Sequence, residues 1–172
     1  MRFIGTAYRA HDPGWSFSPL SGAGAPTHGG RFNPKGVPAL YLALDILGAI
    51  REAQQGLPRK IDPMVLCSYE VDCENVVDLT SPDVRLDLLI SPADLAGGWL
   101  LSAQAGGTPS SWTVAKRLIA SGVAGAIVPS FAPGATSADR NLVLWRRGPD
   151  LPYSVSVHDP SGRLPKNALP WT

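Results

Sequence analysis

Short apolar runs rich in β-branched residues recur along the whole chain, and the helical patterns are grouped between them. These runs predict strands at residues 3–9, 39–44, 63–73, 75–80, 123–131, 141–146 and 153–159. The distribution favours an α+β fold with a mixed, largely antiparallel sheet, because a parallel sheet needs strands and helices in regular alternation. With 172 residues, the chain is predicted to form one domain over 1–172, with a Pro-rich tail at 159–172.

A first helix is predicted over residues 46–55. Asp45 is a suitable N-cap, and Gly56 with Pro58 beyond it is a typical stop. With about 100° between successive residues, the buried stripe of this helix is predicted to consist of Ile46, Ala49, Ile50 and Ala53.

Residues 81–121 have a helical pattern and no candidate chemistry. Ser81 and Ser91 each precede a proline at the first helical position, which is typical of a capped start. Ser110 or Ser111 starts a third helix, with Val114, Leu118 and Ile119 as its apolar stripe and Gly122 at its end. We expect this block to be scaffold.

Charge and composition exclude some functional classes. The net charge is +1, which gives no general attraction to nucleic acid or to an anionic membrane. No apolar run reaches the roughly 18 residues that a membrane span needs, and Gly5 and Arg9 interrupt the N-terminal run that a signal peptide would require. Cys67 and Cys73, six apart on one predicted strand, suit neither a disulfide nor a zinc site. We expect a cytoplasmic protein with reduced thiols and no membrane contact.

The loop at residues 11–36 has neither a helical nor a strand period. Loops of this length in folded domains are usually functional or disordered, and Trp15, Phe17 and Phe32 are expected to anchor this one in an ordered state. Its GAGAP run lacks the third glycine and the preceding strand of a dinucleotide fingerprint, and GRFNPKG is no P-loop. The glycines still let backbone N–H groups approach a phosphate, which Arg31 can grip in bidentate fashion.

The loop, the next strand and the first helix bring together Arg31, Tyr41 and Glu52. Glu52 lies on the flank of the helical stripe and leans over the small residues Gly48 and Ala49, which leave room for a ligand. A solvated glutamate is the plainer alternative. A guanidinium, a phenol and a carboxylate suit an anionic ligand whose reacting centre becomes positive.

Four chemistries are conceivable for these residues. A serine triad lacks a nucleophile elbow, and no His, Cys or Asp cluster has the spacing of metal ligands, so no metal is expected. A metal-free ribonuclease could use His28, Arg31, Lys35 and Tyr41, although a basic stripe with aromatic residues is missing. Cleavage of the N-glycosidic bond of NAD⁺ needs an arginine for phosphate, an aromatic ring and a carboxylate for the cationic ribosyl centre. The grouping fits this last need best.

Three segments then identify a resemblance: GGRFNPKG at 29–36, the YLA-to-Glu segment at 41–52, and the PSF…NLVLW ending at 129–145. Together they closely resemble the RES-domain family, which is named for an Arg, a Glu and a Ser and consists of toxins from bacterial toxin–antitoxin pairs. The resemblance implies an ADP-ribosyltransferase-like fold and consumption of NAD⁺ as substrate, either destroying it or transferring ADP-ribose to a protein acceptor. It also implies an Xre-like antitoxin as partner, through which alone the pair would contact DNA.

The resemblance implies roles for particular residues. The naming residues correspond to Arg31, Glu52 and Ser130, and the family's active-site tyrosine corresponds to Tyr41. We expect Glu52, Arg31 and Tyr41 to be catalytic. The expected ligand-binding set is Arg31, Tyr41, Ser130, Asn141, Lys35 and Arg9.

Overall fold

The structure is a computed structural model that describes residues 1–22, 27–54 and 61–167. Its strands are β1 (Phe3–His11), β2 (Leu40–Ala43), β3 (Val65–Cys73), β4 (Val76–Asp78), β5 (Gly125–Pro129), β6 (Arg140–Leu144) and β7 (Tyr153–Val157). Its helices are α2 (Ile46–Ala53), α3 (Pro82–Asp87), α4 (Pro92–Ala96), α5 (Trp99–Gln104) and α6 (Ser110–Ala120), with a 3₁₀ turn, η1, at Pro13–Trp15.

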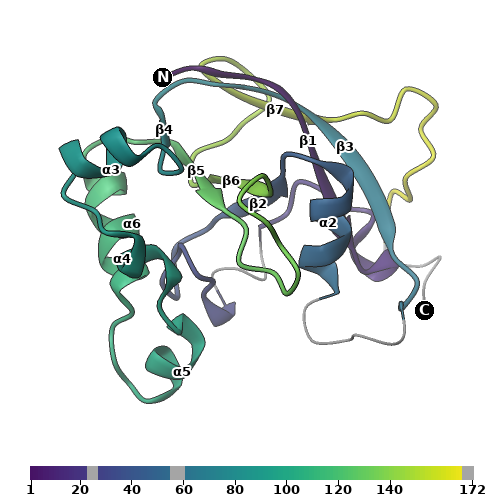
Figure 1. Ribbon diagram of the computed structural model, residues 1–172. Helices are drawn as coiled ribbons and strands as arrows, with labels where there is room; N and C mark the ends of the chain where they lie inside the picture. Colours follow the sequence, from purple (N-terminus) through teal and green to yellow (C-terminus); the bar gives the residue numbers. More distant parts are fainter. Residues whose placement is uncertain (23–26, 55–60, 168–172) are drawn as a thin grey trace.

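The strands form one sheet in the order β4-β5-β6-β2-β1-β3-β7. Only β4 and β5 pair in parallel, and every other neighbouring pair is antiparallel. Figure 1 shows helices α3–α6 gathered at one end of the molecule, whereas α2 lies apart from them beside β1. The predicted α+β fold with a mixed, largely antiparallel sheet is confirmed.

Helix starts follow the predicted caps. Asp45 accepts a hydrogen bond from the amide of Gly48 at the start of α2, and the Ser91 hydroxyl forms a reciprocal capping box with Asp94 at the start of α4. Ser81 caps α3 in the predicted way. Helix α6 begins at Ser110 without a side-chain cap. Local sequence chemistry thus sets where most of these helices begin.

The sheet has a hydrophobic core on each face, and alternate residues of one strand serve different faces. On β6 and just beyond it, Leu142 and Leu144 belong to one core. Val143 and Trp145 belong to the other, which packs beneath α4 and α6. Because side chains alternate along a strand, a strand buried on both faces has the continuous apolar sequence seen here.

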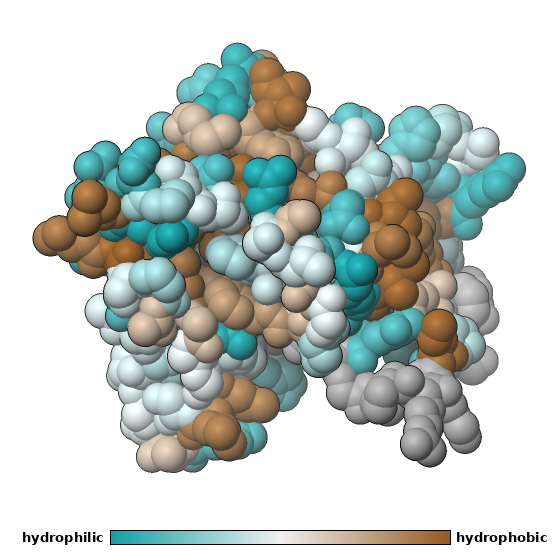
Figure 2. Space-filling model, in the orientation of Figure 1, coloured by the Kyte–Doolittle hydropathy of each residue, from teal (hydrophilic) through white to brown (hydrophobic). Residues whose placement is uncertain are grey.

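The predicted buried stripe of α2 is confirmed at Ala49 and is wrong at Ile46 and Ala53. Ile46 is 46% exposed, Ala53 is also exposed, and the buried residues of the helix are Gly48 and Ala49. Figure 2 shows apolar side chains on the surface over α2, where Ile46 and Leu47 lie. The helix packs against β1 and β2 through its smallest residues, which lets its backbone approach the sheet closely. The buried face is therefore rotated toward Glu52.

The long loop before β2 is ordered by aromatic contacts, but not by all those predicted. Phe32 is 3% exposed, and its carbonyl oxygen accepts a hydrogen bond of 2.8 Å from the indole of Trp145. Trp112 donates in the same way to the carbonyl oxygen of Gly30, at 2.7 Å. Trp15, in contrast, is 58% exposed, and its ring stacks on Phe17 at the surface. The prediction of Trp15 as an anchor is wrong.

The last elements complete one edge of the sheet. Strand β7 follows β3 at the end of the sheet order, and an isolated parallel bridge joins its Ser154 to Gly148. The described part of the tail is tied down by Asp159, whose carboxylate accepts hydrogen bonds from the amides of Arg163 and Leu164. The predictions for 168–172 and for a helix stop at Gly56 lie outside the described residues.

Cys67 and Cys73 are buried and form no disulfide with one another. Within the described ranges no helix is long and apolar enough to cross a bilayer.

Candidate active site

The site forms where three strands of the sheet meet at one end. Ala43, the last residue of β2, pairs with Asn141 on β6, and Asn141 pairs on its other side with Val128 of β5. Only two residues separate the end of β2 from the start of helix α2, so the helix carries Glu52 back over this end of the sheet. Strand register and a short connection therefore bring a carboxylate and an amide together from distant parts of the chain.

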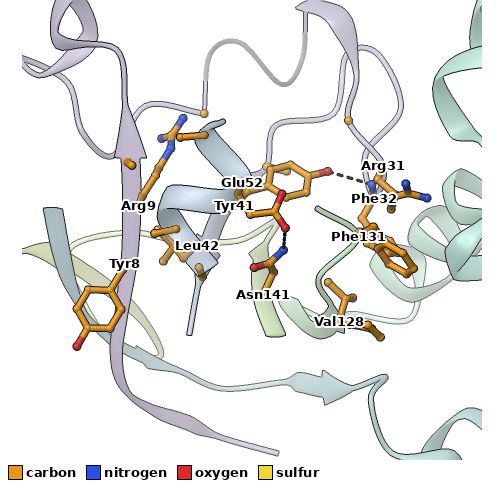
Figure 3. A pocket seen from close by; sticks show the side chains of 18 of the residues that line it. Tyr8, Arg9, Arg31, Phe32, Tyr41, Leu42, Glu52, Val128, Phe131 and Asn141 are labelled. Atoms are coloured by element: carbon orange, nitrogen blue, oxygen red, sulfur yellow. Dashed lines mark hydrogen bonds between the residues drawn. The ribbon is translucent and has the colours of Figure 1, made fainter. Parts of the chain in front are cut away.

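Two side chains hold the Glu52 carboxylate. The Ser130 hydroxyl donates to Oε1 at 2.6 Å, and Nδ2 of Asn141 donates to the same oxygen at 2.5 Å. Figure 3 shows Glu52 and Asn141 facing one another across the middle of the site. The structure thus brings Glu52 together with two other predicted residues, Ser130 and Asn141, which lie 78 and 89 positions away in the sequence. Hydrogen bonds to an ionised acceptor are among the stronger ones in proteins, so the carboxylate is held in one orientation.

An ion pair fastens the segment that carries Ser130 to helix α2. The Arg51 guanidinium contacts the Asp139 carboxylate, which also accepts from the amide and hydroxyl of Thr136, both at 2.7 Å. The amide of Ser130 donates to the carbonyl oxygen of Asp139 at 2.9 Å. Thr136 and Arg51 together lower the pKa of Asp139 below its ordinary value. Asp139 therefore connects helix α2, which carries Glu52, to Ser130, whose hydroxyl orients the Glu52 carboxylate.

Arg31 lies beside this group, stacked on an aromatic ring. Its guanidinium carbon is 4.3 Å from the centre of the Phe131 ring, a cation–π distance. Nη1 also donates to the carbonyl oxygens of Leu95, at 3.2 Å, and Gly97, at 2.7 Å. Burial lowers the pKa of Arg31, while the nearby carboxylate of Glu52 acts in the opposite direction. The ring and the two carbonyls fix the plane of the guanidinium.

The Tyr41 hydroxyl points toward the loop before β2, where it bonds to Asn33 and Phe32. The hydroxyl donates to Oδ1 of Asn33 at 2.6 Å and accepts from the amide of Phe32 at 3.0 Å. Burial raises the pKa of the Tyr41 phenol, so it stays protonated at neutral pH. Gly30 allows this arrangement, because a Cβ there would lie 2.7 Å from the Tyr41 oxygen and 2.5 Å from Oδ1 of Asn33. The hydroxyl thus orders the loop that carries Arg31.

These groups surround a cavity of about 500 Å³, a size within the usual range for small-molecule sites. Of the predicted residues, those lining it are Arg9, Arg31, Tyr41, Glu52 and Asn141. Ser130 reaches the site through its bond to Glu52. Lys35 is exposed and does not line the cavity, so the structure gives no support to its predicted role in ligand binding.

Sequence reasoning missed part of the cavity wall. Trp99 and Phe131 both line it, and Trp99 packs against Trp112 with ring centres 6.5 Å apart. Trp99 comes from the block that was expected to be scaffold alone. Phe131 directly follows Ser130, and this adjacency was the one available signal. Among residues 1–22, 27–54 and 61–167, no group of three or more His, Cys, Asp and Glu could hold a metal ion.

Comparison with known proteins agrees with this architecture. A chain of the MbcT–MbcA toxin–antitoxin complex of M. tuberculosis has a similar fold, with a TM-score of 0.55 and 21% sequence identity over 92% of this chain and 84% of that chain. No curated protein matches the sequence. The model of the RES domain family matches residues 6–167. Since that match covers nearly the whole chain, the protein belongs to the RES domain family.

Proposed function

We propose that this protein is the toxin of a bacterial toxin–antitoxin pair and that it cleaves the nicotinamide–ribose bond of NAD⁺. The observation that carries the proposal is the Glu52 carboxylate, held by Ser130 and Asn141 at a cavity that Arg31 also lines. Membership of the RES domain family supports it. The cavity combines a fixed negative group, fixed positive groups and aromatic walls, which are the parts that this substrate needs.

The chemistry follows from where charge develops. When the C1′–N bond breaks, its electron pair goes to the nicotinamide ring, which leaves as a neutral base, and positive charge develops at C1′. The Glu52 carboxylate stabilises that charge, and Ser130 and Asn141 hold it in place before the reaction begins. An acceptor oxygen then bonds to C1′ and loses its proton. The acceptor is water, phosphate or a protein side chain.

The remaining roles belong to groups that bind the substrate. Arg31 keeps N–H groups besides those that donate to Leu95 and Gly97, and guanidinium groups bind phosphate oxygens in bidentate fashion. The Tyr41 ring lines the cavity and is assigned to packing against nicotinamide. Its hydroxyl is assigned to maintaining the loop rather than to proton transfer, since its pKa is raised.

The proposed partner is an Xre-like antitoxin that covers the site, and the pair would contact DNA through that partner. The fold neighbour was solved as a toxin–antitoxin complex, which supports a protein partner of this kind. The net charge of +1 agrees with a toxin that does not bind DNA by itself.

A metal-free ribonuclease is the second candidate, and the observation in its favour is that His28 lines the cavity. Acid–base cleavage of RNA would need a second group that exchanges protons near neutral pH. Tyr41 does not supply one, because its pKa is raised and its hydroxyl is bonded to Asn33 and Phe32. NAD⁺ cleavage is therefore preferred.

The test is incubation of purified protein with NAD⁺, with and without phosphate and with and without cell lysate. Free nicotinamide and ADP-ribose label on protein are measured together. Release without lysate indicates water as acceptor, or phosphate if phosphate is required, whereas label on one lysate protein indicates a transferase. Absence of both signals, with RNA cleaved in a parallel gel assay, would replace this proposal by the ribonuclease.

Glu52→Gln provides the sharpest variant. Glutamine keeps an oxygen that can accept from Ser130 and Asn141 but removes the negative charge, so we expect nicotinamide release to fall by about 100-fold or more. The matched control is Glu70→Gln, because Glu70 is exposed on β3 and does not line the cavity. Full turnover by folded Glu52→Gln would remove the central role given to Glu52.

A further inference from the structure

The cavity wall contains a tryptophan that the proposed chemistry does not use. Trp99 is the first residue of α5, a helix that has no buried residue. Trp99 itself is partly buried and lines the cavity, whereas Leu100 and Leu101 behind it are 50% and 75% exposed. Core packing therefore does not explain why this apolar helix places its tryptophan at the cavity.

The Trp99 ring is supported by a second tryptophan. The ring centres of Trp99 and Trp112 are 6.5 Å apart with planes tilted by 40°, a usual geometry for an aromatic pair. Trp112 is 9% exposed, and its indole N–H donates to the carbonyl oxygen of Gly30, directly before Arg31. Trp99 is thus connected through Trp112 to the loop that carries Arg31, which gives its ring a defined position before a ligand binds.

A shared hydrogen-bond acceptor places Trp99 next to Arg31. The carbonyl oxygen of Gly97 accepts from Nη1 of Arg31 at 2.7 Å and from the backbone amide of Trp99 at 2.8 Å. Figure 3 shows Arg31 beside Phe131, to one side of Glu52. Trp99 therefore belongs to the part of the cavity wall that lies around Arg31.

A dinucleotide would meet these groups in a definite order. In the proposed function, the scissile C1′ lies at Glu52 and phosphate oxygens lie at Arg31, so the part of the substrate beyond the phosphates extends toward Trp99. That part is a second nucleoside with an aromatic base. Every base has a flat π face, and stacking on an aromatic side chain is a general way to bind it.

We propose that Trp99 is a specificity residue that stacks on the second base of the dinucleotide, which is adenine in NAD⁺. This inference rests on the proposed function, because the order of the groups depends on where the scissile bond lies. Nicotinamide mononucleotide has the same scissile bond and one phosphate but no second base. Trp99 therefore makes the protein prefer NAD⁺ to the mononucleotide.

Trp99→Ala tests this role, with Trp15→Ala as the matched control. Trp15 is 58% exposed and does not line the cavity. Nicotinamide release is measured with NAD⁺ and with nicotinamide mononucleotide. We expect Trp99→Ala to lower kcat/KM for NAD⁺ about tenfold, mainly through KM, and to leave the mononucleotide nearly unchanged. Trp15→Ala should stay within about twofold for both substrates.

Trp99→Phe separates stacking from a structural role. Phenylalanine keeps a flat ring on α5, so it should restore most of the preference for NAD⁺, and it disturbs the contact with Trp112 less than alanine does. An equal fall in kcat/KM for both substrates would assign Trp99 to holding the loop around Arg31 and overturn the proposal. Unchanged kinetics in Trp99→Ala, or a Phe variant as weak as the Ala variant, would overturn it as well.

Binding of AMP, measured by calorimetry on the same preparations, distinguishes this proposal from the proposed function. AMP carries the base and one phosphate but no scissile nicotinamide bond. AMP binding that depends on Trp99, without nicotinamide release by the unmodified protein, would keep the base-stacking role and remove NAD⁺ cleavage. Release from NAD⁺ that is the same in all variants, without AMP binding, would keep NAD⁺ cleavage and remove the role of Trp99. Absence of both signals would remove both.

Discussion

Tyr41→Phe separates a structural role of the Tyr41 hydroxyl from a chemical one. The change keeps the ring that lines the cavity and removes the oxygen that donates to Asn33 at 2.6 Å and accepts from the amide of Phe32 at 3.0 Å. Asn33 is 0% exposed and Phe32 is 3% exposed, so bulk water cannot replace the lost hydroxyl. The amide of Phe32 loses its acceptor in a buried place.

The magnitude follows from the burial of these groups. A buried polar group left without its partner costs about 1–3 kcal/mol. For a chain of this size, about 1 kcal/mol corresponds to roughly 2–4 °C in Tm. We therefore expect the free energy of unfolding to fall by about 1–3 kcal/mol and Tm by about 2–12 °C. Nicotinamide release should change by only a few fold, because the ring remains.

Thermal and urea unfolding, measured beside NAD⁺ turnover, test this expectation. Tyr153→Phe is the control, since within the described residues the Tyr153 hydroxyl has one long, exposed contact of 3.4 Å, with Asn75, and the Tm of this variant should barely move. An unchanged Tm for Tyr41→Phe would refute the structural role. An unchanged Tm combined with a large loss of turnover would assign the hydroxyl to the chemistry itself.

Two other outcomes concern the surroundings of the site. Hydrogen bonds from Thr136 and the charge of Arg51 lower the pKa of Asp139 in the folded state. The ionised Asp139 carboxylate therefore stabilises the fold above the ordinary aspartate pKa, and this stabilisation is lost as the pH falls below about 4. Between about pH 5 and pH 3, Tm should fall less steeply in Asp139→Asn than in the unmodified protein, and equal slopes would contradict this. Lys35 is exposed outside the cavity, so Lys35→Ala should leave the KM for NAD⁺ within about twofold, and a large rise in KM would restore the predicted contact.

Much of the fold could be predicted because its signals are local. The caps at Asp45, Ser81 and Ser91 depend on side chains within a few residues of the amides that they bind. The strands are short apolar runs whose positions need no knowledge of the partner strand.

The face of α2 could not be predicted in this way. Its predicted stripe placed both Ile46 and Ala49 inside, but the helix buries Gly48 and Ala49 and leaves Ile46 exposed. Hydrophobic periodicity weighs side chains by their apolar character, whereas close approach of a helix to a sheet favours the smallest side chains. The cost of exposing Ile46 is offset by the contact of the helix backbone with the sheet, which sequence periodicity does not measure.

The candidate site was predictable in its residue types and not in its connections. Glu52 was expected from the helical spacing, Ser130 and Asn141 only from the resemblance to the RES-domain family, and the structure brings the three together. The contact between Arg51 and Asp139 depends on the register of β2, β5 and β6. No local pattern encodes such a register, because it emerges only when the sheet is assembled.

The distance along the chain between Glu52 and its two partners has a consequence for synthesis of the protein in the cell. A nascent chain that has emerged only as far as α6 already contains Arg31, Tyr41 and Glu52 but not the hydroxyl and amide that hold the carboxylate. Strand β6, which fills the centre of the sheet between β5 and β2, comes after residue 139. The proposed cleavage of NAD⁺ should therefore be absent from polypeptides on the ribosome until strand β6 has been made. A partner that recognises the early part of the chain can bind before the active arrangement exists.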